Sequence, residues 1–439
     1  MITHLTHWRL SILSLGVSCV LFLGLDTAFA SPPFSLKDAI GFAVEHSPVL
    51  DSARLSRNVG ELQVKSAKAK FLPSLDLTSS HGLQKTYTPG ALADPIGSQM
   101  NLSLTENLYD NGESFARYDI SKVNREIASL GFLRAREQLS LDIGTQFFQL
   151  SQAQQLFEVK QKQVDILKKQ LSQVTNHFHE GIQTRTDYLR LATQVKRADI
   201  DVRNAQLTIR QAELELRRLM GVGSTDNVTF QILTADKLPI PSPDDTPPVD
   251  KAFDYRIAKL QTELNPLNVK LVEQKYWPQL LVTSSANYAN FGYLNSPNPY
   301  STNQQYGWNV LLGINFNIFD WGIRRRDVEV AKAQALIQDN ELKKTELQLT
   351  SDIKNLMLTI SQLRATDQLA QELQQAEEET YRFIRNEYEN GKVTYLDLIT
   401  SLNNTLDAKI QYLTTHYGLA TAWTKYHFFR TTLYETVSK

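Results

Sequence analysis

The segment EGIQTRTDYL, residues 180–189, is a short turn signal between two long stretches of helical pattern. A near copy, NGKVTYLDL, lies at residues 390–398. The two copies share a glycine, a threonine and an aspartate at a constant offset: Gly181, Thr184 and Asp187, then Gly391, Thr394 and Asp397. Glycine can take the left-handed backbone that ends a helix, and Thr-x-x-Asp resembles a capping box with Asp in place of Glu or Gln. The chain is therefore predicted to form the same helix–turn–helix twice.

A long stretch without proline precedes each turn. In the first, apolar residues recur every seventh position, with Phe147 and Val174 between them: Ile143, Leu150, Phe157, Val164, Leu171 and Phe178. A sustained seven-residue period is typical of a coiled-coil seam. The second stretch predicts a seam made by Ile353, Leu356, Ile360, Leu363, Leu373 and Ile384. Helices of about 70 residues would be on the order of 100 Å long. Each buries only a narrow stripe, so we expect an elongated molecule.

The duplication extends outward from the turns. VKSAKAKFLPSL (64–75) resembles VKLVEQKYWPQL (269–280), and LYDNG (108–112) resembles IFDWG (318–322). Between the two copies, GVGST and PIPSPDDTPP break all periodicity and indicate a linker. An internal twofold sequence repeat is therefore predicted.

These signals divide the chain into four parts after an N-terminal segment. They are a first repeat, a linker, a second repeat and a C-terminal tail, at 31–220, 221–250, 251–431 and 432–439. The predicted helices are 36–70, 112–179, 185–220, 251–276, 322–389 and 395–431. The predicted strands are 74–84, 99–109, 279–291 and 305–319.

The N-terminal segment is typical of an export signal. Arg9 precedes the apolar run LSILSLGVSCVLFLGL, and AFA at 28–30 supplies small residues for cleavage, so residues 1–30 are predicted to be a signal peptide. The run is too short to favour a retained membrane helix. Cys19, the only cysteine among 439 residues, lies inside it and follows a poor lipoprotein signal. The mature chain would then hold no thiol and no disulfide, which suits an oxidising compartment.

Composition and motifs argue against several classes of protein. The net charge is −1 and charged residues make up 21%, so nothing indicates a nucleic-acid partner or a polybasic anchor. No Walker loop, HExxH, GxSxG or GxGxxG motif is present, so we expect neither an enzyme nor a cofactor. His177 and His179 flank Phe178 of the seam and are predicted to be surface residues, and the scattered methionines give no metal site.

Alternation replaces the helical period in the four predicted strands. In YGWNVLLGINFNIFD (306–320) one side is apolar and the other is mostly small or amide-bearing. A soluble sandwich would bury the apolar face, whereas a membrane barrel would expose it to lipid; strands of about ten residues suit the barrel. Aromatic residues, Trp277, Trp308 and Trp321 among them, collect at the strand ends, where membrane interfaces place them. Four strands cannot close a barrel, because the smallest membrane barrels have about eight. If the strands span a bilayer, several chains must therefore contribute.

The chain resembles the TolC-like outer-membrane efflux protein (outer membrane factor) family in four features taken together. They are the export signal, the duplicated helix–strand–strand–helix order, FLPSL and YWPQL before the strands, and the Gly-x-x-T-x-x-D turns. The resemblance covers essentially the whole mature chain. It implies an α+β membrane protein that forms a homotrimer, whose four strands per chain make a shared barrel of about twelve strands in outer-membrane lipid. A coiled-coil helical tunnel would project into the periplasm. The family's function is a passive exit duct, which receives cargo from an inner-membrane pump through a periplasmic adaptor in efflux or type I secretion.

The resemblance also assigns roles to residues of the two turns, which would form an iris-like periplasmic gate. Thr186 and Asp187 fall on one side of a link between neighbouring helices and Tyr388 on the other, while Asp397 falls on an aspartate ring that narrows the pore. Val393 stands where the family's well-known version has an arginine, and Thr400 where it has a second ring aspartate. The gate is therefore expected to have fewer polar links and a weaker cation block.

Two other interpretations remain open at the level of sequence. A periplasmic adaptor is a binding protein built around a helical hairpin, but it would lack two alternating strand pairs and the complete duplication. A trimeric coiled-coil adhesin would have its barrel at one terminus and no internal copy.

Overall fold

The structure is a computed structural model that describes residues 33–83, 95–181, 184–223, 228–233, 241, 245–293 and 303–438. The predicted signal peptide, 1–30, and Cys19 lie outside these residues. The fold is a mostly helical α+β fold. Its helices are α1 (Leu36–His46), α2 (Pro48–Ala69), α3 (Glu113–His179), α4 (Arg185–Met220), α5 (Phe253–Glu273), α6 (Ile323–Glu389), α7 (Tyr395–Phe429) and α8 (Leu433–Ser438). Its strands are β1 (Ser74–Leu83), β2 (Pro95–Tyr109), β3 (Gln279–Tyr293) and β4 (Asn303–Asn315).

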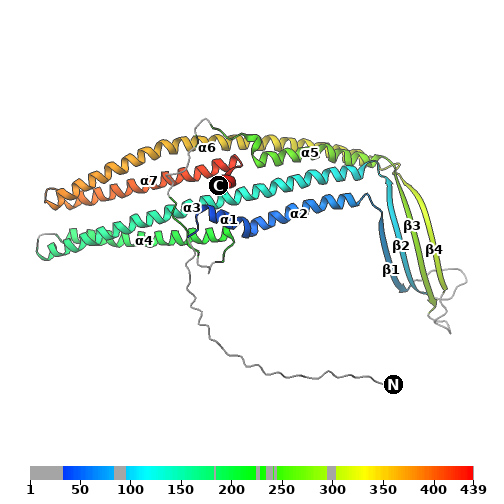
Figure 1. Cartoon of the computed structure of the whole chain (residues 1–439), viewed down its shortest axis with the longest axis horizontal. Coiled ribbons are helices and arrows are strands. Elements are labelled where there is room, and N and C mark those ends of the chain that lie inside the picture. Colours follow the sequence, from blue (N-terminus) through cyan, green and yellow to red (C-terminus); the bar gives the residue numbers. More distant parts are fainter. Residues whose placement is uncertain are drawn as a thin grey trace, which may run out of the picture.

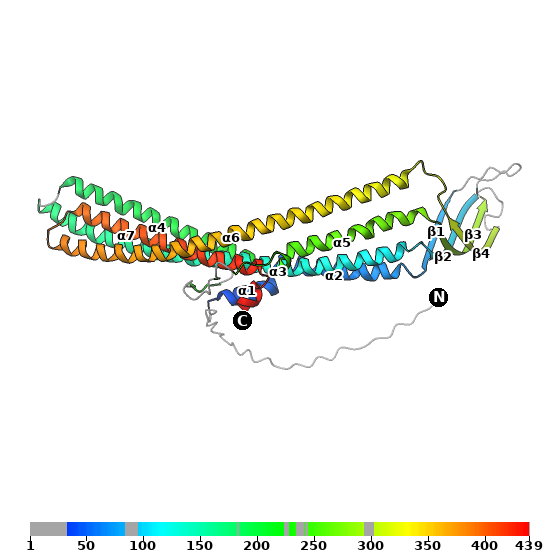
Figure 2. The same ribbon diagram turned by 90° about the horizontal axis from the view of Figure 1, so that it is seen from above.

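The molecule is elongated, with the sheet at one end and two helix turns at the other (Figure 1). The helices α3 and α6 each have 67 residues and run the length of the helical part. Near the sheet they lie with α2 and α5, and toward the turns with α4 and α7 (Figure 2). Within the described ranges, no helix is both long enough and apolar enough to cross a membrane.

The four strands form one antiparallel sheet in the order β1-β2-β3-β4. Residues directly opposite each other across strands share a face. One row runs through Leu77, Leu102, Ala286 and Trp308, and the neighbouring row on the other face runs through Thr78, Asn101, Asn287 and Gly307. The sheet therefore has an apolar face and a polar, small-residue face. Large side chains of the apolar face are exposed, Trp308 at 81% and Ile314 at 73%.

The main core lies at mid-length and gathers helices from both ends of the sequence. It includes Ile40 of α1, Phe147 of α3, Leu216 of α4 and Tyr417 of α7, all essentially inaccessible to solvent. The hydroxyl of Tyr417 donates a hydrogen bond to the carbonyl of Leu233 at 2.9 Å. A second core nearer the turns joins α3, α4 and α7.

The first predicted coiled-coil seam is confirmed, because Ile143, Phe147, Leu150, Val164 and Val174 are buried and the remaining members are half-buried. In the second seam Ile353, Leu356 and Ile360 are buried, but Leu373 is 42% exposed. The prediction for Leu373 is wrong because α6 lies at the edge of the helical layer toward the turns, where α7 is its main neighbour (Figure 2).

The predicted single helix at 36–70 is wrong. The chain breaks at Ser47, which is extended (φ −71°, ψ 124°), and α2 restarts with Pro48 at its first turn. Proline disfavours helical backbone at the preceding residue and cannot donate the hydrogen bond that would continue α1.

Other boundaries also differ from the predicted ones. The expected helix at 251–276 is shorter, with 3₁₀ turns η2 (Val249–Lys251) and η3 (Gln274–Tyr276) on either side of α5. The expected strand at 305–319 ends at Asn315. Residues 432–439 were predicted as a tail, but α8 packs against the core there: Leu433 is fully buried, and the backbone N–H of Tyr434 donates to Glu137 Oε2 at 3.1 Å.

Gly221 at the end of α4 tests the mid-length packing. Its φ is +74°, and a Cβ there would lie 2.7 Å from the carbonyl oxygen of His46. We expect Gly221→Ala to lower the free energy of unfolding by about 2–3 kcal/mol, because it adds a clash to a left-handed backbone. Gly391→Ala is the matched control: its φ is +73° with no atom near the new Cβ, so we expect a loss of only about 1 kcal/mol. Equal midpoints of thermal unfolding for the two variants, followed by far-UV circular dichroism, would contradict this account.

Candidate functional site

The two helix turns at the end remote from the sheet have closely similar capping geometry. At the first turn, Thr184 Oγ1 accepts from the backbone N–H of Asp187 at 3.2 Å and donates to Asp187 Oδ2 at 2.6 Å. At the second, Thr394 and Asp397 make the same two bonds, and the backbone N–H of Thr394 also donates to Asp397 Oδ2 at 2.9 Å. The capping role predicted for these residues is therefore confirmed. The bonds from Thr394 lower the pKa of Asp397, so it is ionised at neutral pH.

The turn glycines have the predicted left-handed backbone, with φ +76° at Gly181 and +73° at Gly391. Each lies two residues beyond the last residue of its long helix, where a left-handed residue closes the last turn. The backbone N–H of Gly181 donates to the carbonyl of Phe178 at 3.1 Å, and that of Gly391 to the carbonyl of Tyr388 at 3.0 Å.

A cavity of about 830 Å³ lies between the two turns. It brings together two of the predicted gate residues, Asp187 of α4 and Tyr388 of α6, with the predicted turn glycine Gly391. Thr186 and Asp397 are exposed and do not line it. Val393 is half-buried in its wall, and Thr400 is exposed one turn beyond Asp397 on α7. The other residues around the cavity are Gln173, Asn176, His177, Glu180, Glu389, Thr394, Tyr395 and Leu396.

A pair of tyrosines forms the less polar side of this cavity. The rings of Tyr388 and Tyr395 meet edge to face with centroids 6.3 Å apart. Burial raises the pKa of Tyr388, and the negative charge of Asp187 raises it further. The pKa of Tyr395 is raised more strongly by the same causes, together with Tyr388. Both phenols are therefore neutral throughout the physiological range.

Tyr395 was not singled out from the sequence. Its hydroxyl is buried and has no hydrogen-bond partner among the residues that the structure describes. The available signal was its position: it follows the capping Thr394 directly, so it begins α7 beside the last turn of α6. The sequence alone did not show that the two turns would face each other.

The three predicted interface tryptophans lie around the sheet. Trp277 is 63% exposed, and Trp308 and Trp321 are each 81% exposed. Trp277 and Trp321 lie at the junctions between sheet and helices. There the turn before α6 is held by Asp320, whose carboxylate accepts from the backbone N–H groups of Gly322 and Arg324 at 3.1 and 3.2 Å. Asp110 caps α3 in the same way.

Within the described ranges, no group of three or more His, Cys, Asp or Glu side chains could hold a metal ion. His177 and His179 are exposed, and Phe178 between them stacks on Tyr188 with ring centroids 5.8 Å apart. The turns offer the carboxylates of Glu180, Asp187, Glu389 and Asp397 beside two neutral phenols. These carboxylates can attract cations.

The sequence profile of the family described as outer membrane efflux protein matches residues 39–222 and 253–425. The chain belongs to this family. The resemblance predicted from the sequence is confirmed, and the family is one of outer membrane efflux channels, which are not enzymes.

Solved structures of other channels have the same fold as this family member. The outer membrane channel CmeC of Campylobacter jejuni is 16% identical, with a TM-score of 0.79 over 90% of this chain and 85% of that chain. CusC is 14% identical, with a TM-score of 0.75 over 90% and 91%. The MtrE outer membrane channel of Neisseria gonorrhoeae, in its open state, is 18% identical, with a TM-score of 0.70 over 92% and 88%. No curated protein sequence matches the chain.

The unpaired hydroxyl of Tyr395 generates a test of the packing at the turns. We expect Tyr395→Phe to raise the free energy of unfolding by about 1 kcal/mol, because it removes a buried hydroxyl without a partner. Tyr417→Phe, which removes the donor to Leu233, should lower it by about 1 kcal/mol.

The raised pKa of Tyr395 also predicts a pH dependence with a defined sign. Below the ordinary tyrosine pKa of 10.0 the phenol is neutral in both the folded and the unfolded chain, so its ionisation does not affect stability. Above that pH the unfolded chain loses the proton first, so the free energy of unfolding falls as the pH rises. Between about pH 9 and pH 11 the free energy of unfolding should therefore fall less in Tyr395→Phe than in the wild type. Chemical denaturation across that range measures this, and a larger alkaline loss in the variant than in the wild type would contradict it.

Proposed function

We propose that three copies of the chain assemble into an exit duct of the outer membrane. Four strands from each copy would close a barrel of about twelve strands, and the helices would form a tunnel in the periplasm. The duct would act as a passive conduit from the periplasm to the exterior, in a tripartite efflux or type I secretion system with a periplasmic adaptor and an inner-membrane pump.

One observation carries this proposal: a two-faced sheet whose outer strands lack a neighbour. Large side chains of the apolar face are exposed on β1, β2 and β4, and those of β3 are half-buried. The outer edges of β1 and β4 pair with no strand in the part of the chain that the structure describes. Unpaired backbone groups are costly in lipid, so a membrane sheet must close. A soluble sandwich would instead bury Trp308 and Ile314, which are exposed.

The helices support an assembly of several copies. Toward the turns they lie in the order α4-α3-α7-α6, so α4 and α6 form the two outer edges. Along α6, leucines exposed by 65–72% recur every eleven residues, close to three helical turns: Leu336, Leu347, Leu358 and Leu369. α4 also carries exposed apolar residues, Leu207 and Leu214 among them. These two uncovered apolar edges could cover each other in neighbouring copies, as helices of a coiled coil do.

The order of the elements supports the proposed internal repeat. The series α2-β1-β2-α3-α4 is followed by α5-β3-β4-α6-α7, and both long helices are preceded by an aspartate cap and a left-handed glycine. Because each chain has two such units, an assembly of three chains would have six similar units around its axis.

We propose that the turns form the periplasmic gate. Asp187 and Tyr388, together in one cavity, would hold the two helical hairpins closed against each other, with Thr186 beside them. Asp397 is exposed and ionised, so three copies around an axis would concentrate negative potential and attract cations. Val393 supplies no hydrogen bond in the cavity wall, and Thr400 adds no second carboxylate.

Cross-linking of the strand edges tests the assembly. Thr78→Cys on β1 and Asn309→Cys on β4 lie on the polar face, away from lipid. Oxidation of outer membranes from cells that express the double variant should give linked dimers and trimers and nothing larger. If β1 and β4 of neighbouring copies pair two residues out of this register, Gly307→Cys or Leu311→Cys should replace Asn309→Cys as the partner of Thr78→Cys. Each single-cysteine variant is a control and should stay monomeric. A ladder beyond three, or no links in any register, would contradict the proposed closure.

Conductance in planar bilayers tests the ring assigned to Asp397. Asp397→Asn should raise the half-blocking concentration of a divalent cation by about fivefold, because it removes one charge per copy at short range. Thr400→Asp should lower it. Asp407→Asn makes the same charge change farther along α7 and is expected to have no effect. An unchanged block in Asp397→Asn would refute the ring.

A further inference from the structure

Grooves lined by aromatic residues lie at both junctions between the helices and the sheet. The first, between α2 and α3, has a volume of about 620 Å³ and a floor of Ala69, Phe71, Leu72, Phe115 and Tyr118. The second, beside α5 and α6, has a volume of about 900 Å³ and includes Tyr276, Trp277 and Phe316. The two grooves differ in the charges at their rims.

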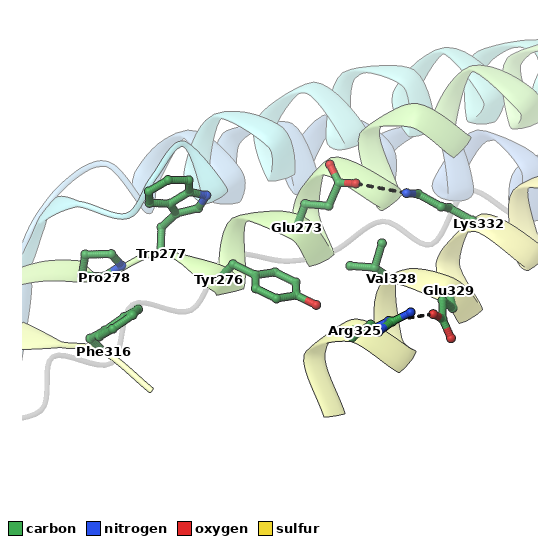
Figure 3. A pocket seen from close by; sticks show the side chains of 9 residues that line it. All are labelled: Glu273, Tyr276, Trp277, Pro278, Phe316, Arg325, Val328, Glu329 and Lys332. Atoms are coloured by element: carbon green, nitrogen blue, oxygen red, sulfur yellow. Dashed lines mark hydrogen bonds and ion pairs between the residues drawn. The ribbon is translucent and has the colours of Figure 1, made fainter. Parts of the chain in front are cut away.

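In the second groove every cation has an acidic partner. Lys332 pairs with Glu273 at 3.7 Å and Arg325 with Glu329 at 3.2 Å, as the dashed lines in Figure 3 mark. Four charges of alternating sign cancel there, so this rim offers no net attraction to an anion.

In the first groove three lysines face one acidic residue, Asp119. Lys122 pairs with Asp119 at 2.8 Å and lies over the ring of Tyr118 at 4.5 Å. Lys65 and Lys68 lie one turn apart on the same side of α2, are exposed, and have no ion-pair partner among the described residues. The rim therefore has a net positive charge beside an apolar floor.

The floor is apolar and accessible. Leu72 is 69% exposed and Phe115 is 64% exposed. Within the floor, Phe71 packs on Phe115 with ring centroids 4.9 Å apart, and this contact holds the two rings in place. Ammonium groups over such a surface fit an amphiphile with an anionic head and a hydrocarbon tail, because lysine stems lie along apolar surface while their ammonium groups bind phosphate.

We infer that the groove of Lys65 and Lys68 binds one anionic phospholipid per chain. The two ammonium groups would bind the headgroup phosphate, and an acyl chain would lie on Phe115 and Leu72. The groove adjoins the first residue of β1. This inference therefore rests on the proposed membrane placement of the sheet, which puts the lysines at headgroup level on the periplasmic side.

Native mass spectrometry of the detergent-solubilised protein tests the inference, with phosphatidylglycerol as the probe and phosphatidylcholine as the zwitterionic comparison. The wild type should retain one phosphatidylglycerol per chain. Lys65→Gln with Lys68→Gln should raise the half-saturating concentration by about thirtyfold, from two lysines of headgroup attraction, and leave the weaker binding of phosphatidylcholine unchanged. Phe115→Ala should weaken the binding of both lipids.

The matched control is Lys162→Gln with Lys169→Gln, two exposed lysines of α3 that lie about 65 and 75 Å along the helix from Tyr118. It makes the same change of net charge and should bind phosphatidylglycerol as the wild type does. The inference would be overturned if the Lys65/Lys68 variant and the wild type reached half-saturation at the same phosphatidylglycerol concentration. It would also be overturned if the wild type bound no lipid, a result that would indicate that a neighbouring copy covers the groove. A protein that fractionates with the outer membrane but fails this test loses only the lipid site. A protein absent from that membrane loses the proposed function as well.

Discussion

The backbone edges of β1 and β4 constrain the rest of the molecule. A strand edge is a row of donors and acceptors that water can satisfy and lipid cannot. The exposed apolar face of the sheet favours lipid, with Trp308 and Ile314 pointing away from the rest of the chain. The proposed pairing of the edges with strands of other copies would satisfy both conditions together. The length of the helices, the uncovered leucines of α6 and the position of the turns far from the sheet are consistent with that closure.

Stability is distributed unevenly along the molecule. At mid-length, α1, α3, α4, α7 and α8 share one core, and buried Glu137 accepts from the backbone of α8. At the turns the contacts include a few caps, the ring pairs Tyr388–Tyr395 and Phe178–Tyr188, and the walls of a polar cavity between two hairpins. Sites that open are drawn from the least stable parts of proteins. A gate at the turns could therefore move while the mid-length core stays fixed, and Asp187 with Tyr388 lies where such a movement would begin.

Periodicity and capping chemistry predicted most of the architecture, because both are local. The seven-residue stripe located the buried side of α3, and the Thr-x-x-Asp pairs located the starts of α4 and α7. Three features depended on contacts that are distant in sequence. Leu373 has the spacing of a core residue but lies at an edge. α8 packs on a core built from distant helices, and Tyr395 lies near Asp187 of α4. The break before Pro48 is different, since the proline was a local signal that the prediction overlooked. The roles proposed for Thr186 and Asp397 depend on an assembly, because in one chain both residues are exposed.

The number of chains per particle tests the central claim most directly. Light scattering with the detergent contribution subtracted, or mass photometry, measures it on the purified full chain in mild detergent and again after the detergent is removed. The account predicts particles of three chains in detergent and aggregation without it, because the apolar face then meets water. A monodisperse single chain that stays in solution without any detergent would contradict it.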